Sequence, residues 1–223
     1  MSIRKKILAI SIGPVLVLGV ITLLFMLTMV KSSLMDEVQD ALKGTAAATL
    51  AAYDQNTGDY LESTNGDIWK GSYNISKSES LVDRIKENTG MDVTFFYGNK
   101  RIMTSALDKK GNRILGSEAG ERVVNQVIKG KKPFFSTNVS LDGTRNYGYF
   151  IPVYQNGTTD QVIGMVFVGT NKARKDAIVN KILGSIMMAL LVVMLLCIVT
   201  AMRMAASISK NICLLYTSDA ADE

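Results

Sequence analysis

The sequence predicts an α+β domain, made of a long helix and a five-stranded antiparallel sheet, between two transmembrane helices. Two observations lead to this prediction. Apolar runs without a charged residue stand near both ends of the chain, at Ile7–Val30 and Ile182–Met202. Between them, a helical pattern precedes five short segments rich in β-branched and aromatic residues, which are separated by Gly, Asn and Asp turns. Elements in this order favour a sheet with helices packed on it.

Both apolar runs are long enough to span a bilayer. Crossing about 30 Å of hydrocarbon takes roughly 18–20 residues, and a buried core helix rarely runs so far without a charge. The first run is also too long for the apolar core of a signal peptide, and no clean cleavage site follows it. Because Arg4, Lys5 and Lys6 precede the first run, we expect the N-terminus in the cytoplasm and residues 31–181 outside.

After the first span, a helix is expected from about Leu34 to Tyr53. Its small and apolar residues recur at alternating spacings of four and three, at Leu34, Val38, Ala41, Thr45, Ala48 and Ala52. This narrow seam predicts packing against the helix's own domain. The alternative is that its membrane-proximal half also pairs with the same helix of a second subunit, which would make the protein a homodimer.

The elements that follow are predicted from turn signals and periodicity. Residues 54–80 are rich in Asp, Asn, Gly and Ser, so turns should dominate there. Short helices are expected at Ser78–Asn88 and Glu121–Lys129, and a charged helix at 171–181. The five expected strands are Met91–Tyr97, Arg101–Leu107, Pro133–Ser140, Asn146–Tyr154 and Gln161–Thr170. One face of the sheet should bury against the long helix, and the other can hold a pocket under the loop 108–120.

The composition argues against several functions. The chain has no histidine, and its two cysteines, Cys197 and Cys213, lie outside 31–181. A Cys/His metal site or a His-based catalytic triad in the outer segment is therefore excluded. No pair of carboxylates has a spacing that suggests acid–base chemistry, so we expect neither an enzyme nor a cofactor. The net charge is a modest +5, and the basic residues form no stripe with interleaved aromatics. Nucleic-acid binding is therefore not expected.

Three stretches of the chain carry a resemblance to a known family. They read TGMDVTFFYGNKRIMTSALDKKGNRILGSEA, GYFIPVYQNG and VIGMVFVGTNK. Together they resemble the single-Cache (PAS-like) sensor domain of bacterial methyl-accepting chemotaxis proteins. The resemblance implies a transmembrane chemoreceptor that senses a small extracellular ligand, such as an organic acid or another small polar metabolite. The alternatives are the sensor domain of a histidine kinase or a diguanylate cyclase, or a membrane-anchored structural protein that binds no ligand.

The end of the chain carries two further resemblances. Residues 204–212 resemble the opening of a HAMP linker, which implies signalling to chemotaxis proteins through a cytoplasmic part that is missing here. Residues 213–223, CLLYTSDAADE, are similar to a translated sequencing adapter. The expected organisation is a cytoplasmic N-terminus at 1–6, spans at 7–30 and 182–202 around a sensor domain at 31–181, a truncated HAMP-like start at 203–212, and an adapter-derived tail at 213–223.

The resemblance also implies where a ligand binds. Related carboxylate sensors use an Arg-x-x-His strand pattern, and Arg101-x-x-Thr104 matches its arginine but not its histidine. Gly148 stands where those sensors carry a second arginine, so a monocarboxylate, another small polar metabolite or an amino acid is as well favoured as a di- or tricarboxylate. Arg113 and Tyr149 complete the predicted ligand-binding set. Each has a plainer alternative, since Arg101 could be solvated and Arg113 could simply pair with an acidic residue.

Two further expectations concern the strands around this site. Tyr147 and Tyr149 share strand parity and Phe150 has the opposite parity, so one of the two sets should be core and the other should face the pocket. No flexible linker separates the strand Gln161–Thr170 from the second span, so a displacement of this strand by ligand should be carried through the helix at 171–181.

Overall fold

In this computed structural model the backbone is described for residues 3–156 and 158–219, and the side chains for residues 10, 12–156 and 158–208. The chain divides into two compact units. One unit, Met35–Ala177, contains all the strands and is called the domain below. The other consists of the two ends of the chain and is called the helical unit. The adapter-like segment lies partly outside the described residues, which end at 219.

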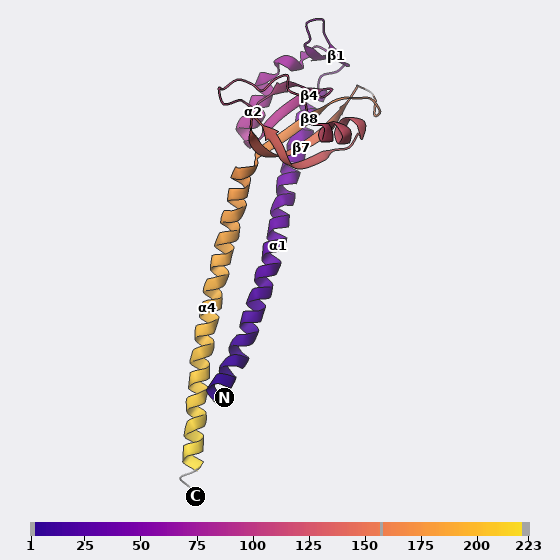
Figure 1. The fold of residues 1–223 in the computed structure, drawn as a ribbon. Helices are drawn as coiled ribbons and strands as arrows, with labels where there is room; N and C mark the ends of the chain where they lie inside the picture. Colours follow the sequence, from indigo (N-terminus) through magenta and orange to yellow (C-terminus); the bar gives the residue numbers. More distant parts are fainter. Residues whose placement is uncertain (1–2, 157, 220–223) are drawn as a thin grey trace. The chain divides into compact units, whose positions relative to one another are not determined.

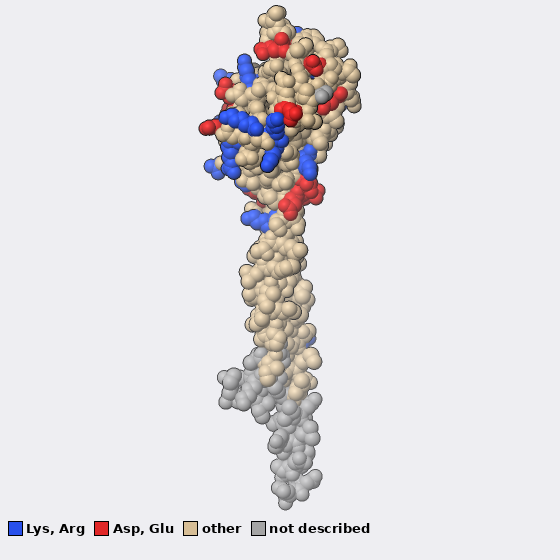
Figure 2. Space-filling view, turned by 90° about the vertical axis from the view of Figure 1, so that its right-hand side faces the viewer, with Lys and Arg blue, Asp and Glu red and all other residues tan. Residues whose placement is uncertain are grey.

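The helical unit is formed by the outer parts of two long helices, α1 (Ile3–Asp54) and α4 (Lys172–Asp219). Both are long and apolar enough to cross a membrane, and both contain the spans predicted from sequence. Within this unit, a Cβ on Gly19 would overlap the flexible side chain of Met194, so the two helices approach each other closely at this glycine. On the face shown in Figure 2, nearly all charged side chains lie on the domain and the described surface of the helical unit is almost uncharged.

Helix α1 continues without interruption from the helical unit into the domain. The sequence suggested a span ending at Val30 and a separate helix starting near Leu34, whereas Ile3–Asp54 is one helix. Likewise α4 starts at Lys172, directly after the last strand, as expected. Each long helix therefore belongs to both units.

A five-stranded antiparallel sheet is the centre of the domain, as predicted (Figure 1). Its spatial order is β5-β4-β8-β7-β6. The strands are β4 (Asp92–Tyr97), β5 (Lys100–Thr104), β6 (Phe134–Leu141), β7 (Thr144–Tyr154) and β8 (Val162–Asn171). Helix α2 (Glu79–Thr89) precedes β4 and ends at Gly90, which adopts a left-handed conformation with φ +68°. The expected strand bounds agree with the observed ones within three residues at each end.

The turn-rich segment 54–80 contains a second sheet that the sequence did not predict. Its strands are β1 (Tyr60–Glu62), β2 (Ile68–Lys70) and β3 (Tyr73–Asn74), followed by the 3-10 turn η1 (Ile75–Lys77). Turns were expected to dominate here, and the three strands were not foreseen because they are too short to show alternation. Tyr60, Ile68 and Ile75 are nevertheless buried in the main core, so the small sheet is part of the domain's packing.

Alternation along the strands divides the domain into two cores, one on each face of the sheet. The helix-side core packs the sheet against α1 and α2, and it is the larger; it consists of Leu42, Ala46, Tyr53, Tyr60, Ile68, Ile75, Val82, Met91, Val93, Phe95, Met103, Tyr147, Tyr149, Val153, Val166 and Val168. The cavity-side core consists of Phe96, Ala106, Val127, Leu141, Phe150, Met165 and Phe167. Helix α3 (Glu121–Val123) and the π-helical turn η2 (Val124–Lys129) cover part of this second face.

The buried stripe of α1 differs from the seam predicted for it. Leu42, Ala46, Thr49 and Tyr53 are fully buried, whereas Ala41 and Ala48 of the predicted seam are exposed. The sheet therefore packs against the side of α1 that carries Leu42 and Tyr53, because these two side chains bury more apolar area than alanines do.

Pro152 lies inside β7, where an edge position or a bulge was expected. It pairs with Met165 of β8, whereas the pairing of β7 with β6 starts only at Phe150. The side of Pro152 that lacks an N–H therefore has no strand partner, so β7 is locally an edge at this point.

Candidate ligand-binding site

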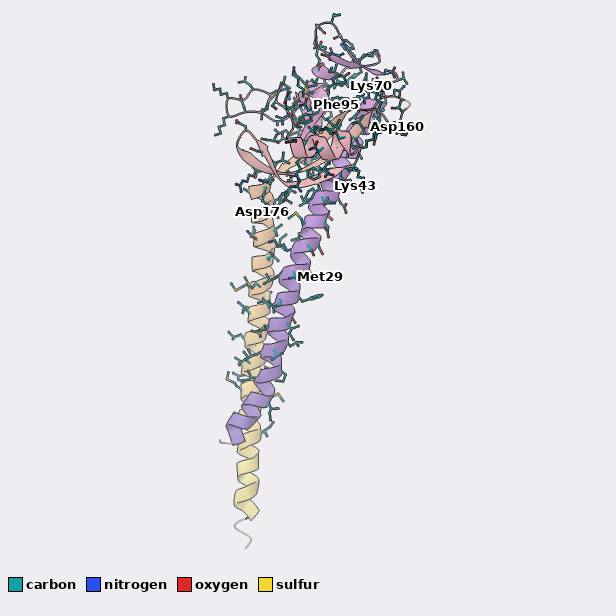
Figure 3. The ribbon with its side chains drawn as sticks, turned by 45° about the vertical axis from the view of Figure 1, so that its right-hand side comes forward. Met29, Lys43, Lys70, Phe95, Asp160 and Asp176 are labelled. Atoms are coloured by element: carbon teal, nitrogen blue, oxygen red, sulfur yellow. The ribbon has the colours of Figure 1, made fainter. Side chains whose placement is uncertain are left out.

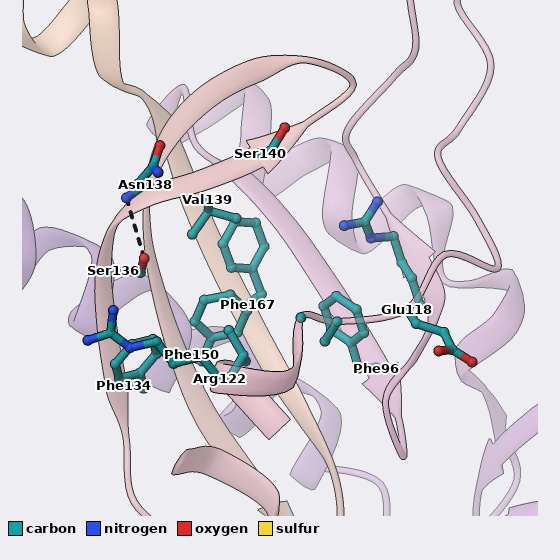
Figure 4. Close-up of a pocket in the computed structure, with 14 residues that line it drawn as sticks. Phe96, Glu118, Arg122, Phe134, Ser136, Asn138, Val139, Ser140, Phe150 and Phe167 are labelled. Atoms are coloured by element: carbon teal, nitrogen blue, oxygen red, sulfur yellow. Dashed lines mark hydrogen bonds between the residues drawn. The ribbon is translucent and has the colours of Figure 1, made fainter. Parts of the chain in front are cut away.

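The face of the sheet opposite α1 holds a cavity of about 380 Å³. This volume lies within the range of about 300–1,000 Å³ that is usual for small-molecule sites. Figure 4 shows four phenylalanines around it, together with polar residues from β6 and from the segment before η2. The lining residues are Phe96, Arg101, Glu118, Ala119, Gly120, Arg122, Val123, Phe134, Ser136, Asn138, Val139, Ser140, Phe150 and Phe167.

A β-bulge places Arg101 on this face. In the β4–β5 pair, Phe95 lies opposite Met103 but Phe96 lies opposite Arg101, so Ile102 is the extra residue on β5. Without the bulge, Arg101 would share the face of Met103 and point towards the helix-side core. With it, Arg101 lies opposite Phe96 and lines the cavity. The bulge therefore brings a positively charged side chain into the lining of the cavity.

The guanidinium of Arg101 is buried and incompletely paired. The residue is only 7 % exposed. Its Nη1 donates to the carbonyl oxygen of Ile114 at 3.2 Å, while its Nε has no hydrogen-bond partner among the described residues. The guanidinium lies 5.4 Å from the ring centre of Phe96. Burial lowers the pKa of Arg101 from its ordinary value, but a guanidinium remains protonated in proteins. The cavity therefore contains a cation with an unused donor.

A loop holds Arg101 in this position. The loop 108–120 runs along β5, the edge strand of the sheet, and covers its free edge. The backbone N–H of Arg101 donates to Ser117 at 2.9 Å, and its carbonyl oxygen accepts from Gly116 at 2.9 Å. The same loop brings Glu118, Ala119 and Gly120 to the cavity. This agrees with the sequence-based expectation of a pocket under this loop.

The walls of the cavity are mainly aromatic. Phe150 and Phe167 are in contact, with ring centres 4.7 Å apart, and Phe134 lies 6.4 Å from Phe150. Figure 4 shows these rings together on one side of the cavity, with Phe96 on the adjoining strand. Apolar walls of this kind bury hydrocarbon, and they also weaken dielectric screening around Arg101.

A pair of glycines makes room for this arrangement. Gly148 of β7 lies directly opposite Gly169 of β8. A Cβ on Gly148 would lie 2.5 Å from Cε2 of Phe167, and a Cβ on Gly169 would lie 2.4 Å from its Cζ. The ring of Phe167 therefore lies over both backbones. Gly148, where related sensors were expected to place an arginine, contributes space for a ring instead of a charge.

Polar groups complete the lining. Ser136, Asn138 and Ser140 come from β6, and Asn138 donates its backbone N–H to the Ser136 hydroxyl at 3.4 Å. Arg122 is exposed, and its guanidinium lies 5.4 Å from the ring centre of Phe134. In Figure 4 the carboxylate of Glu118 points away from the four rings. Arg101 is thus the one buried cation among the lining residues.

Thr104, the second residue of the predicted pattern, lies close to Arg101 in sequence but does not line the cavity. It is fully buried, and its hydroxyl shares a hydrogen bond of 2.7 Å with the hydroxyl of Thr94. The same oxygen lies 3.2 Å from the carbonyl of Val93 and accepts from the N–H of Ala106 at 3.1 Å. These bonds join β5 to β4, so the contacts of Thr104 are structural.

Arg113 is placed outside the cavity as well. Its guanidinium binds both carboxylate oxygens of Asp83, at 2.9 and 2.5 Å, and also donates to the carbonyl of Thr104 at 2.7 Å. The bidentate bond from Arg113 lowers the pKa of Asp83, and the same bond raises the pKa of Arg113. The plainer alternative, pairing with an acidic residue, describes these contacts.

Tyr149 lies on the other face of the sheet. It belongs to the helix-side core together with Tyr147, while Phe150 lines the cavity. The parity argument separated the two sets correctly, but it did not say which set faces the pocket. The structure brings only Arg101 of the four predicted residues to the cavity. Strand alternation could have identified Phe96, Phe150 and Phe167 as a group, since they share a face once the register is known.

A second cluster joins β7 to the start of α4. The Tyr147 hydroxyl donates to Asp176 at 2.5 Å, and Lys172 donates to the same hydroxyl at 2.7 Å. The ammonium of Lys172 also lies 4.2 Å from the ring centre of Tyr147. Burial raises the pKa of Tyr147, and the bond to Tyr147 raises that of Lys172. Figure 3 shows Asp176 in the first part of α4.

Comparisons with known proteins give a family match for part of the chain. Residues 73–182 match the profile of the family described as "Single cache domain 3". The fold is thus that of an α+β Cache domain, with a five-stranded antiparallel sheet flanked by two long apolar helices. No curated protein matches the chain.

Among solved structures, the chain is similar to an extracellular ligand binding receptor from Desulfohalobium retbaense DSM5692. The sequence identity is 15 % and the TM-score is 0.47. The match covers 68 % of this chain and 26 % of that structure, so this chain spans about a quarter of its length.

Proposed function

We propose that this chain is the sensing part of a transmembrane receptor, and that its domain binds a small organic ligand in the cavity at Arg101. The domain would lie outside the cell, held by the two apolar helices in the plasma membrane. This follows from the basic residues Arg4, Lys5 and Lys6 before the first span, which favour a cytoplasmic N-terminus.

The observation that carries this proposal is the unpaired Nε of Arg101. Buried polar groups in folded proteins nearly always have a partner, and leaving a donor unpaired costs on the order of 1–3 kcal/mol. Arg101 itself lines a cavity large enough for a metabolite, and its Nε has almost no accessible surface in the ligand-free chain. A ligand with an acceptor atom would pair with it, and a carboxylate suits the planar donor geometry of a guanidinium.

Strand β7 supports a route for the signal. Phe150 of this strand lines the cavity. Three residues earlier in the same strand, Tyr147 donates a hydrogen bond to Asp176, which joins β7 to the start of α4. β8 also lines the cavity, through Phe167, and leads into α4 without a linker. A ligand would shift α4 only by its difference in affinity for two arrangements, typically about 1–3 kcal/mol of coupling.

We further propose that the cytoplasmic output is that of a chemoreceptor. The support is the HAMP-like resemblance of residues 204–212 and the Cache match of the domain. Reading the gene beyond Ile212 tests this. A long methylatable helical hairpin supports a chemoreceptor, while a kinase or GGDEF domain would replace this proposal with one of the alternative outputs.

Ligand binding is tested on the full chain in lipid nanodiscs. A library of organic acids and amino acids is screened by thermal shift, since a ligand that binds only the folded state raises the melting temperature. Arg101→Gln should abolish the shift. Arg145→Gln, which removes the same charge from an exposed residue of β7 outside the cavity, should retain it. If no compound stabilises the folded chain, or if both variants respond alike, the proposed site is wrong.

A further inference from the structure

The lining of the cavity restricts what it can hold. Resting on the proposed function, we infer that the ligand is a monoanion with an apolar body, whose carboxylate pairs with Arg101 and whose hydrocarbon packs among Phe96, Phe134, Phe150 and Phe167. An aryl or branched-alkyl carboxylate has this chemistry.

The charge of the ligand follows from the burial of the cations. Arg101 is the buried cation among the lining residues, and it makes no ion pair with a described carboxylate. One carboxylate neutralises it. A second carboxylate would have to rely on Arg122, which is exposed and lies over the ring of Phe134, where water screens its charge. Inside the cavity, a second negative charge would be left without a partner.

The apolar body follows from the walls. Three of the four phenylalanines, Phe96, Phe150 and Phe167, are almost fully buried and belong to the cavity-side core. The fourth, Phe134, is partly exposed at the first position of β6. A polar ligand would cover these rings without gaining hydrophobic contact and would lose its own hydration. A ring or branched chain buries its own apolar area and part of Phe134, and it gains dispersion contact with the three buried rings.

The position of the glycines supports the same conclusion. Because Gly148 and Gly169 let Phe167 lie over the backbone, the sheet presents an aromatic ring where a polar side chain could otherwise reach the ligand. The hydroxyls of Ser136 and Ser140 and the amide of Asn138 all come from one strand, β6. These groups are uncharged and lie at the opposite edge of the sheet from β5, which carries Arg101, so they offer no cation to a second carboxylate.

The test compares three probes by calorimetry on the full chain in lipid nanodiscs. The probes are phenylacetate, its neutral amide phenylacetamide, and malate, a dianion without an apolar body. Phenylacetate should bind at least about tenfold more tightly than either of the others, because a hydrogen bond to a charged group contributes this much affinity or more. Arg101→Gln should remove the preference for phenylacetate over phenylacetamide.

A matched pair of variants tests the apolar walls. Phe134→Ala should weaken phenylacetate binding by about tenfold through lost apolar contact. Phe135→Ala changes the next residue, which faces the helix-side core and stacks on Tyr147, and it should leave the affinity within about twofold. If Phe134→Ala does not fold, Phe134→Ser and Phe134→Leu replace it, and the serine variant should bind phenylacetate more weakly than the leucine variant.

Other outcomes would overturn the inference. Tighter binding of malate that depends on Arg101 would mean a polar dianion site, and would leave the proposed function standing. Equal binding of phenylacetate and phenylacetamide, or equal losses in the two phenylalanine variants, would also overturn it. If none of the three probes binds, an Arg101-dependent library hit that is another apolar monocarboxylate supports the inference, and a hit of any other kind shows that the ligand class is wrong. If the screen finds nothing, the proposed function itself fails.

Discussion

Phe95 and Phe96 are neighbours in β4, but they lie in two different cores, which differ in how their side chains are packed and paired. Phe95 is fully buried on the helix side, with its ring centre 5.2 Å from that of Tyr53 and 5.8 Å from that of Tyr60. Phe96 faces the other way and borders a cavity of about 380 Å³. Phe95 is thus enclosed by other aromatic side chains, whereas Phe96 has open space beside it, which close-packed protein interiors normally lack.

The polar groups of the two cores differ in the same way. On the helix side, the hydroxyl of Tyr53 shares a hydrogen bond of 2.8 Å with that of Ser78, and Lys70 pairs with Asp54 at 3.1 Å. Burial raises the pKa of Tyr53, which keeps it neutral. On the cavity side, the Nε of Arg101 has no partner among the residues that the structure describes. The helix-side groups Tyr53 and Lys70 are thus paired without a ligand, whereas Arg101 keeps an unused donor; the other buried side-chain atom without a partner among the described residues is Oδ1 of Asn74, in β3.

The largest expected effect concerns packing. Phe95→Ala should lower the free energy of unfolding by about 3–5 kcal/mol, the usual cost of removing a fully buried phenylalanine. Phe150→Ala should cost at least about 1 kcal/mol less, because Phe150 already borders empty space and loses fewer contacts. Chemical denaturation of the full chain in nanodiscs measures both. Equal losses would show that the cavity side is as closely packed as the helix side.

The next effect compares two arginines. Arg101→Met should raise the free energy of unfolding of the ligand-free chain by about 1 kcal/mol, because it removes a buried cation with an unmet donor. Arg113→Met should instead lower it by about 1 kcal/mol, because it removes the bonds to Asp83 and to the Thr104 carbonyl. The same denaturation experiment measures both. Changes of the same sign would remove the distinction between a ligand-binding and a structural arginine.

A smaller effect tests the connection between β7 and α4. Tyr147→Phe keeps the ring beside Phe135 but removes the bonds to Asp176 and Lys172. Local opening should become easier by about 1 kcal/mol, which corresponds to roughly fivefold faster hydrogen exchange of the amides at 172–176. Ligand affinity should not change, because Tyr147 does not line the cavity. Unchanged exchange would show that this cluster does not hold the start of α4.

The smallest effect is in the pH dependence of stability. Since Arg113 holds the pKa of Asp83 below its ordinary value, the stability from this pair is present above the unfolded pKa of about 3.9. It is lost as the pH falls through the folded pKa. Asp83→Asn and Arg113→Met should each flatten the fall in melting temperature below about pH 4. A slope that neither variant changes would argue against this ion pair in solution.

Much of the fold could be predicted from the sequence, because turn residues and alternation mark the strands of the main sheet. The small sheet at 60–74 could not, since strands of two or three residues carry no periodic signal. The buried stripe of α1 was also misplaced. Small residues recur along one side of this helix, but the sheet packs against the side that carries Leu42 and Tyr53.

The lining of the cavity was harder to predict from the sequence than the fold. The resemblance pointed to Arg101, and the structure brings Arg101 to the cavity. Its orientation depends on a bulge beside Phe96, and a bulge arises from strand pairing that a single segment does not reveal. Tyr149 was chosen over Phe150 because parity alone cannot tell which face of a strand meets the helix. The phenylalanine walls were missed for the same reason.

The facing glycines Gly148 and Gly169 also bear on how this domain changes over generations. A single base change in a glycine codon introduces alanine or serine, and at Gly148 either would displace Phe167 and Val139. The cavity would then change shape while Arg101, on the edge strand β5 of the same sheet, kept its place. If the proposed site is correct, the shape of the cavity and its binding of an anion are separable traits, and a substitution at Gly148 can alter the first while Arg101 maintains the second.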